Sequence, residues 1–263
     1  MIVIDNGSDE PLEELISRYS FARLLTELQP GSYAARNKGL KVARGEILAF
    51  TDADCLPLHD WLETGEKCLN KDEGVDRIGG DIAVFPKVED SPNAAELYDC
   101  IFGLNQRNNV NTLHFAATAN MFTRRSVMDR VGPFRSDMKS SGDVEWGSRA
   151  TDMGCSLIFA DDAIVRHPAR ETLEELLTQA RRHAGGRTSV NAGKKFRVFS
   201  GHGILTLLRA FVPNIAKVIK AWRHPRCAGT ANKIRVARVI LIIQYCKSFE
   251  LIRTRLGGRL ERR

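Results

Sequence analysis

The sequence lacks closely spaced cysteines. It has six, and none lies near another along the chain, which argues against a zinc site and against a disulfide framework. A reducing cytosol is therefore the expected compartment. The first residues already look like a strand, so no signal peptide is expected. The six cysteines are Cys55, Cys68, Cys100, Cys155, Cys227 and Cys246.

Long uncharged apolar segments are missing as well. The most apolar stretches, Ile204 to Val212 and Val236 to Ile252, lie among Lys and Arg residues, and neither reaches the roughly 18 uncharged residues that a spanning helix needs. Basic amphipathic helices in a membrane interface fit this pattern. The alternative is that these helices pack on the rest of the protein or in a dimer.

Acidic residues are scarce in the last third of the chain only. Residues 181–263 hold 20 Lys and Arg against two Asp and Glu, whereas residues 1–180 hold 19 against 30, for a net charge of +7. This split indicates that the two parts face different partners. A basic part suits nucleic acid, an anionic membrane or an anionic ligand.

What is present is typical of a globular α/β protein. The chain has 263 residues, 43% of them hydrophobic and 27% charged, which is enough for one large domain with an appendage. Strands are predicted at residues 2–4, 23–25 and 47–50, and a helix at 33–43 with Ser32 as its N-cap. Strands that alternate with helices over short loops predict a mostly parallel, doubly wound sheet.

The central stretch of the sequence runs from Gly45 to Cys55. It contains a predicted buried strand that is followed by two carboxylates, Asp52 and Asp54. Ligands bind at the carboxyl ends of strands in open α/β sheets, and Asp5 ends another strand at the same rim. Two carboxylates there suit a hard divalent cation. Alternatively, Asp54 caps the following helix.

Two further candidates follow later in the chain. Asp143 opens a predicted helix, either as a carboxylate stabilised by the helix dipole or as a catalytic base. His167 ends the second of two predicted short strands, 157–159 and 163–165, as a structural hydrogen-bonding group or a metal ligand. Residues 91–111 look irregular, and their polar part, 105–109, is predicted to be a surface loop or lid.

These pieces occur in an order that resembles the family 2 glycosyltransferases, which have the GT-A fold. The resemblance covers residues 1–187 and leaves 188–263 as a basic, helical, membrane-associating or packing extension. The matching segments are Asp5-Asn6-Gly7-Ser8, Ala35-Arg36-Asn37-Lys38-Gly39, Asp52-Ala53-Asp54, Asn120 with Arg124-Arg125, Gly132-Pro133-Phe134, Gly142-Asp143-Val144-Glu145 and His167-Pro168.

The resemblance implies a metal-dependent, inverting transfer of a sugar from a nucleotide-sugar, expected to be a UDP-sugar, to a hydroxyl of a glycan or lipid-linked acceptor. Asp143 matches the general base, and Asp54 with His167 matches the site of Mg²⁺ or Mn²⁺, which neutralises the leaving diphosphate. The remaining implied contacts are to the donor nucleotide through Asp5, Arg36, Asn37 and Asp52, and to acceptor or phosphate through Asn120, Glu145, Trp146 and Arg182.

The resemblance has one departure, at the start of the chain. Family members usually have a strand and a helix before the strand that ends at Asp5, so an open sheet edge is expected beside the donor site. An inactive nucleotide-sugar-binding remnant of the same fold is therefore the alternative function. The basic extension is expected at the cytoplasmic face of an anionic membrane. Nucleic acid is not expected, because the extension contains no recognised nucleic-acid module.

Overall fold

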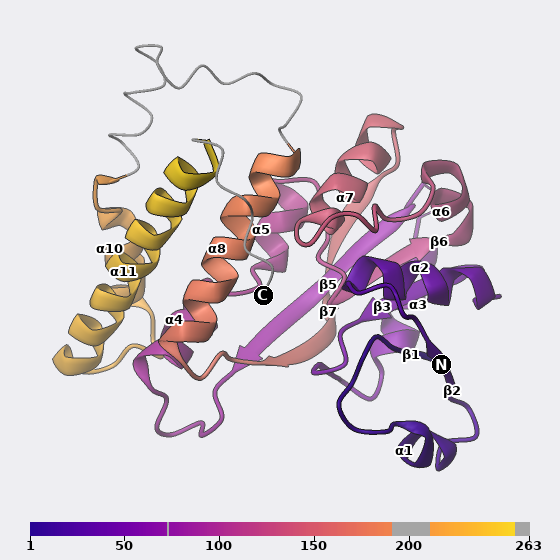
Figure 1. Cartoon of the computed structure of the whole chain (residues 1–263), viewed down its shortest axis with the longest axis horizontal. Helices are drawn as coiled ribbons and strands as arrows, with labels where there is room; N and C mark the ends of the chain where they lie inside the picture. The colour runs from indigo at the N-terminus through magenta and orange to yellow at the C-terminus, as the bar shows by residue number, and fades with distance from the viewer. Residues whose placement is uncertain (73, 191–210, 256–263) are drawn as a thin grey trace. The chain divides into compact units, whose positions relative to one another are not determined.

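The computed structural model describes residues 1–72, 74–190 and 211–255 (Figure 1). The chain forms two compact units. Unit 1 comprises Met1–Asp52, Leu58–Asp81 and Gln106–Ile164; unit 2 comprises Ala53–Pro57, Ile82–Asn105 and Val165–Arg263.

Unit 1 carries most of the strands and the helices between them; the far ends of β5 and β7 belong to unit 2. Its elements are β1 (Ile2–Asp5), α1 (Glu13–Ser17), β2 (Arg23–Thr26), α2 (Ser32–Val42), β3 (Ile47–Thr51), α3 (Trp61–Asn70), β5 (Arg77–Phe85), α5 (Gln106–Asn111), β6 (Asn120–Arg124), α6 (Arg125–Val131), α7 (Gly142–Asp152) and β7 (Leu157–Pro168).

The strands form two sheets. β1 and β2 pair in parallel with Ile2 opposite Arg23, and a five-stranded sheet has the order β3-β6-β5-β7-β4, where β4 is Leu56–Pro57. The predicted mostly parallel sheet is wrong in this detail: β3 with β6, β5 with β6 and β4 with β7 are all antiparallel. The path of the connecting segments sets the direction of each strand. Here β6 runs opposite to β3 and β5, and β7 runs opposite to β4.

In the part of the chain that the structure describes, two strands of unit 1, β1 and β3, each pair with another strand on one side only. Within the described residues β1 pairs only with β2, and β3 pairs only with β6, so each strand has one edge outside any ladder. Both strands belong to unit 1 and both lead into candidate site loops. The strands that lead to Asp5 and Asp52 therefore lie at sheet edges.

The core of unit 1 forms where helix α3 packs on the middle of the five-stranded sheet. Phe122 on β6 and Ile78 on β5 are almost fully buried, and the ring of Trp61 lies 4.9 Å from that of Phe122, centroid to centroid. Gly65 faces the same ring, and a Cβ there would approach it to 2.3 Å. The helix thus packs closely because this position has no side chain.

Three local predictions need correction. α2 begins at Ser32 and its N-cap is Gly31, whose φ of 127° suits glycine, so Ser32 does not cap it. β7 is one continuous strand, where two short strands were predicted. The segment 91–111, predicted to be irregular, contains α4 (Ala94–Phe102) and α5, and α5 covers most of the predicted loop or lid at 105–109. Gln106 in this stretch is buried, and its side-chain amide exchanges hydrogen bonds with the backbone of Ala117.

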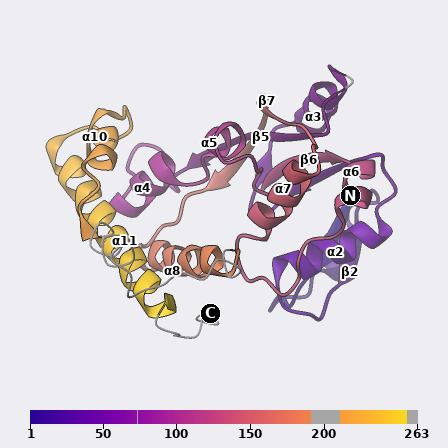
Figure 2. The same cartoon turned by 90° about the horizontal axis from the view of Figure 1, so that it is seen from above.

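Unit 2 is mainly helical. It contains β4, α4, α8 (Leu173–Val190), α10 (Ile215–Arg223) and α11 (Thr230–Arg255), and the two views show these helices side by side (Figures 1 and 2). The helices share one buried core, to which α11 contributes Val236, Ile240 and Ile243. The predicted domain boundary at residue 187 falls inside α8. Helix α11 is thus part of the core of unit 2.

Among the described residues, the helices are all too short or too polar to cross a membrane. The segment Ile204 to Val212, predicted to be an interfacial helix, lies largely outside the described residues.

The contact between α3 and β6 leads to a stability prediction. We expect Gly65→Ala to destabilise the protein by about 1–3 kcal/mol in urea denaturation, because the added Cβ forces the ring of Phe122 out of place. Gly74→Ala is the control, because a Cβ there meets no atom within 4 Å. Equal midpoints for the two variants would contradict the packing argument.

Candidate active site

Asn6 ties the loop after β1 to the loop before α2. Its side-chain amide donates to the carbonyl oxygens of Glu27 at 2.7 Å and Gln29 at 2.8 Å, and its Oδ1 accepts from the Gly31 N–H at 2.8 Å. These bonds replace the ladder that ends with β1 and β2. Asn6 therefore holds together the two loops that carry Asp5 and the start of α2.

Asp5 is the last residue of β1, and its side chain caps the tight turn that follows. Its Oδ1 accepts from the N–H groups of Ser8 at 2.9 Å and Gly7 at 3.1 Å. These hydrogen bonds, with those from Ser8 the strongest, lower the pKa of the Asp5 carboxyl. The carboxylate is ionised at neutral pH and accepts hydrogen bonds, as the predicted contact to a nucleobase needs; the contact stays a prediction.

Arg36 and Asp52 form an ion pair between α2 and the end of β3. The distance from Nη2 to Oδ1 is 2.5 Å, and the two side chains are 16% and 35% exposed. The guanidinium also lies over the ring of Tyr33, 5.5 Å from its centroid. Two of the predicted donor-binding residues are therefore in direct contact and share a partly desolvated position.

Asp143 lies in the first turn of α7, beside the same pair. Its Oδ1 accepts from the Val144 N–H at 2.9 Å. Burial raises the pKa of the Asp143 carboxyl; the Val144 N–H and the charge of Arg36 oppose the shift, and the charge of Asp52 adds to it. A partly buried carboxylate with a raised pKa takes up a proton more readily than a fully exposed one, which suits a general base.

Unit 2 contains a separate group of metal-ligating side chains, Asp54, Cys55 and His167. Their candidate ligand atoms lie within 4.8 Å of one another, and Asp54 is exposed whereas Cys55 and His167 are buried. His167 Nδ1 lies 2.7 Å from the Pro168 carbonyl oxygen, which can only accept, so this nitrogen carries the hydrogen. The other ring nitrogen, Nε2, faces Asp54 Oδ2 at 3.5 Å.

This arrangement fits a bound cation. A neutral imidazole nitrogen and a carboxylate oxygen that face each other both present lone pairs, so a cation or a proton between them is favourable. A backbone carbonyl that fixes the far ring nitrogen is the usual support of a metal-bound histidine. Carboxylate, imidazole and thiolate together suit a borderline divalent metal better than a purely hard one.

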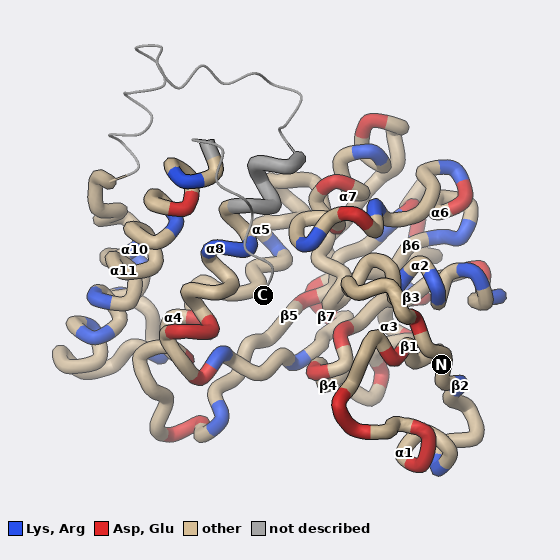
Figure 3. Tube along the Cα trace, in the orientation of Figure 1, with Lys and Arg blue, Asp and Glu red and all other residues tan. Residues whose placement is uncertain are grey.

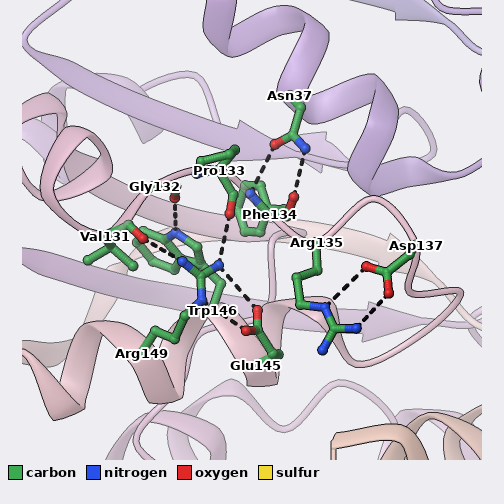
Figure 4. A network of polar contacts seen from close by, with 10 residues as sticks. All are labelled: Asn37, Val131, Gly132, Pro133, Phe134, Arg135, Asp137, Glu145, Trp146 and Arg149. Carbon is green, nitrogen blue, oxygen red and sulfur yellow. Dashed lines mark hydrogen bonds and ion pairs between the residues drawn. The ribbon is translucent and has the colours of Figure 1, made fainter.

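Several predicted contact residues instead hold the loop 132–134 (Figure 4). Asn37 exchanges two hydrogen bonds with the backbone of Phe134, at 2.7 and 3.0 Å. Trp146 is fully buried and its Nε1 donates to the Gly132 carbonyl at 2.9 Å. Glu145 pairs with Arg149 at 2.9 Å. Asn37 and Trp146 thus bind this loop directly, and Glu145 acts through Arg149, which donates to the Pro133 carbonyl at 2.8 Å.

Asn120 is also fully buried. Its amide nitrogen donates to the carbonyls of Asp81 at 2.7 Å and Ala163 at 2.8 Å, and its oxygen accepts from Trp61 Nε1 at 2.8 Å. Both amide hydrogens are used, so none is left for an acceptor or phosphate. Arg182 is exposed on α8 in unit 2, and its predicted phosphate contact stays a prediction.

Two residues of these clusters were missed by the sequence reasoning. Cys55 was dismissed because no second cysteine lies near it, but metal ligands need only be close in space. Tyr33 was treated as an ordinary helix residue, yet its hydroxyl contacts the start of α7. The position of Cys55 directly after Asp54 was the one available signal.

The comparison with known proteins now identifies the family. The family model of glycosyl transferase family 2 matches residues 1–132. Glycosyltransferase AglE of Haloferax volcanii is 35% identical over 259 residues, which make up 95% of this chain and 83% of that protein. The chain belongs to glycosyl transferase family 2.

A further relative of this family 2 glycosyltransferase and a solved structure of similar fold were found. The pre-mycofactocin glycosyltransferase of Mycobacterium tuberculosis is 27% identical over 194 residues, 70% of this chain and 41% of that protein. A mannosyltransferase from Pyrobaculum calidifontis, solved in complex with GDP-Man and Mn²⁺, matches with a TM-score of 0.60 and 18% identity over 97% of this chain and 77% of that one. The predicted family and GT-A fold are confirmed.

The burial of Asp143 leads to a prediction about stability and pH. The pKa of this carboxyl is raised above its ordinary value of 3.8, so its ionised form costs the folded enzyme stability at neutral pH and the cost disappears as the pH falls. We expect Asp143→Asn to raise the urea midpoint at pH 7.5, and to raise it less at pH 5.

Asp137→Asn is the matched control for this measurement. Asp137 is exposed and its pKa is lowered by Arg135, so its carboxylate favours the folded state at neutral pH and the substitution should lower the midpoint slightly. A midpoint that drops in Asp143→Asn, equally at both pH values, would contradict the raised pKa.

Proposed function

We propose that this enzyme transfers a sugar from a nucleotide-sugar to a hydroxyl of a glycan or lipid-linked acceptor by a metal-dependent, inverting reaction. The observation that carries the proposal is the cluster of Asp143, in the first turn of α7, with the pair of Arg36 on α2 and Asp52 directly after β3. It brings a proton-accepting carboxylate together with the residues that match the donor-binding motif.

Asp143 is the proposed general base. As the acceptor hydroxyl oxygen attacks the anomeric carbon, its proton moves to the Asp143 carboxylate, and the bond from that carbon to the diphosphate oxygen breaks with its electron pair on the diphosphate. Such assistance contributes typically about 10²- to 10⁴-fold in rate. The raised pKa of Asp143 increases its proton affinity during this step.

Asp5 and the Arg36–Asp52 pair are the proposed donor contacts. Asp5 accepts a hydrogen bond from the nucleobase, which we take to be uracil. Asp52 binds the ribose, and its ion pair with Arg36 holds the Asp52 carboxylate in place. The Pyrobaculum mannosyltransferase was solved with GDP-Man, so both UDP- and GDP-sugars belong in the assay.

Asp54, Cys55 and His167 are the proposed holders of the divalent metal, and of the two ions Mn²⁺ and Mg²⁺ their nitrogen and sulfur atoms favour Mn²⁺. The bound metal would neutralise the charge of the leaving diphosphate. Asp54 is exposed and can reach a ligand from solvent, whereas the bond from Nδ1 to Pro168 fixes the ring of His167. The protein thus supplies one exposed ligand, Asp54, and one ligand held by a hydrogen bond, His167.

A single experiment separates the two proposed roles. We expect Asp54→Ala to lose both Mn²⁺ binding and sugar transfer, because it removes a metal ligand. We expect Asp143→Asn to bind donor and Mn²⁺ like the unmodified enzyme but to transfer sugar at least about 10²-fold more slowly. Calorimetry measures the binding, and release of nucleoside diphosphate measures the transfer.

Asp137→Asn is the control in this assay, because its carboxylate pairs on the surface with Arg135. Full turnover by Asp54→Ala would overturn the metal site. Donor and Mn²⁺ binding by the unmodified enzyme, without transfer to any acceptor, would instead favour the inactive binding remnant.

The membrane-facing role is proposed for α10. Ile215, Ile219 and Trp222 lie at helical spacing and are 66%, 46% and 46% exposed. Lys220 and Arg223 lie on the same helix, and Figure 3 shows further Lys and Arg residues along α11. Exposed apolar side chains flanked by cations suit the interface of an anionic membrane.

We expect the triple change of Ile215, Ile219 and Trp222 to serine to abolish sedimentation with phosphatidylserine vesicles at low salt. All three side chains are exposed, so the fold should tolerate the change; truncation is a poorer test because Val236 and Ile240 lie in the core of unit 2. The control is Leu28→Ser, at a residue of unit 1 that is 88% exposed. Unchanged sedimentation would contradict the role of α10.

A further inference from the structure

The backbone at the start of α7 is hydrogen-bonded to Tyr33, a residue that the proposed mechanism does not use. We propose that Tyr33 is a positioning residue for the base Asp143, holding the backbone at Gly142 and supplying a hydrogen bond to the carboxylate. This inference rests on the proposed function, in which Asp143 is the general base.

The Tyr33 hydroxyl lies at the N-terminus of α7. Its oxygen accepts from the Gly142 N–H at 2.8 Å and more distantly from the Asp143 N–H at 3.4 Å. The first N–H groups of a helix have no partner within the helix, and Ser141 before them makes no side-chain cap. Tyr33 therefore satisfies a backbone donor that would otherwise be buried without a partner.

The same hydroxyl has one hydrogen to give. Both N–H groups use its oxygen as acceptor, so its hydrogen points to the remaining acceptor, Asp143 Oδ1, at 3.4 Å. Burial, with the charge of Asp143 adding to it, raises the pKa of Tyr33 to about 12, so the phenol keeps its proton at neutral pH. The bond is long, and its donor is always present.

The tyrosine ring also accounts for the glycine at the position before Asp143. A Cβ at position 142 would come within 2.6 to 2.9 Å of three ring atoms of Tyr33. Ser141 has a φ of 62°, a left-handed conformation that costs energy for a serine. The turn before Asp143 is thus shaped around the ring of Tyr33.

The ring itself is held from two sides. Arg36 lies over it at 5.5 Å, and the ring of Phe134 packs against it at 5.9 Å. The charged or titratable groups that act on Asp143 are Tyr33, Arg36 and Asp52. Among them Tyr33 combines a hydrogen bond to the carboxylate with one to the backbone before it.

The test is Tyr33→Phe, which keeps the ring and removes the hydroxyl. We expect kcat to fall about tenfold with the KM for donor changed less than about twofold, because the donor contacts are untouched. The acid limb of the kcat profile should move to higher pH, because the ionised carboxylate loses a donor and its pKa rises. A ¹³C-NMR titration of the Asp143 carboxyl reads the same shift without turnover.

Tyr98→Phe is the matched control, since Tyr98 is a buried tyrosine in unit 2 whose pKa is also raised to about 12 by burial. Loss of the Tyr98 hydroxyl should leave kcat and the pH profile of kcat unchanged. Gly142→Ala supplies a second test: we expect it to lower kcat strongly with Tyr33 present and less in a Tyr33→Ala background, because the ring it strikes is then absent.

The outcomes separate this inference from the proposed function. An unmodified enzyme that transfers sugar, with a Tyr33→Phe variant of equal kcat and equal Asp143 titration, overturns the positioning role alone. Loss of transfer in Tyr33→Phe with an unshifted titration and no coupling to Gly142→Ala also overturns it. Absence of transfer by the unmodified enzyme overturns the proposed function, and the carboxyl titration still tests the contact.

Discussion

Backbone groups at the ends of the strands must find hydrogen-bond partners once the sheet ladder stops, and side chains supply them around the candidate site. Asn6 binds three backbone groups in the loops before α2, and Asn37 binds both backbone groups of Phe134. Tyr33 does the same for Gly142. These bonds fix the segments that follow Asp5 at the end of β1 and precede Asp143 at the start of α7.

This constraint separates the motif residues into two kinds. Asn37, Asn120 and Trp146 carry polar atoms of the right type for a ligand, but these atoms already bind protein groups at 2.7 to 3.0 Å. The acidic residues differ, because a carboxylate accepts several hydrogen bonds and gains from a nearby cation. For Asp52 that cation is Arg36. For Asp54, whose carboxylate oxygen faces Nε2 of His167, a bound metal would serve.

The two units answer different physical demands. Unit 1 is built on strand pairing, and most of its site residues follow strands or open helices. Unit 2 has little sheet, so its stability comes from apolar residues shared among α4, α8, α10 and α11. Basic residues remain on the outside of these helices because charged side chains are costly to bury. The apolar side of the amphipathic helices in the last third of the chain therefore packs in a core. We propose that the other side contacts a membrane.

The sequence by itself determined the family, the α/β class, the strands that end at Asp5 and near Asp52, and the candidate carboxylates. These features depend on local periodicity and on motifs with fixed spacing, which the order of residues records directly. Only the tertiary structure decided the antiparallel pairing of β6, the burial of Asn120, and the contacts of Cys55 with Asp54 and His167 and of Tyr33 with Asp143. Each of these features brings together residues that lie far apart in the sequence or depends on what surrounds a side chain. Hydrogen bonding and burial depend on distances in space, which the order of residues does not record.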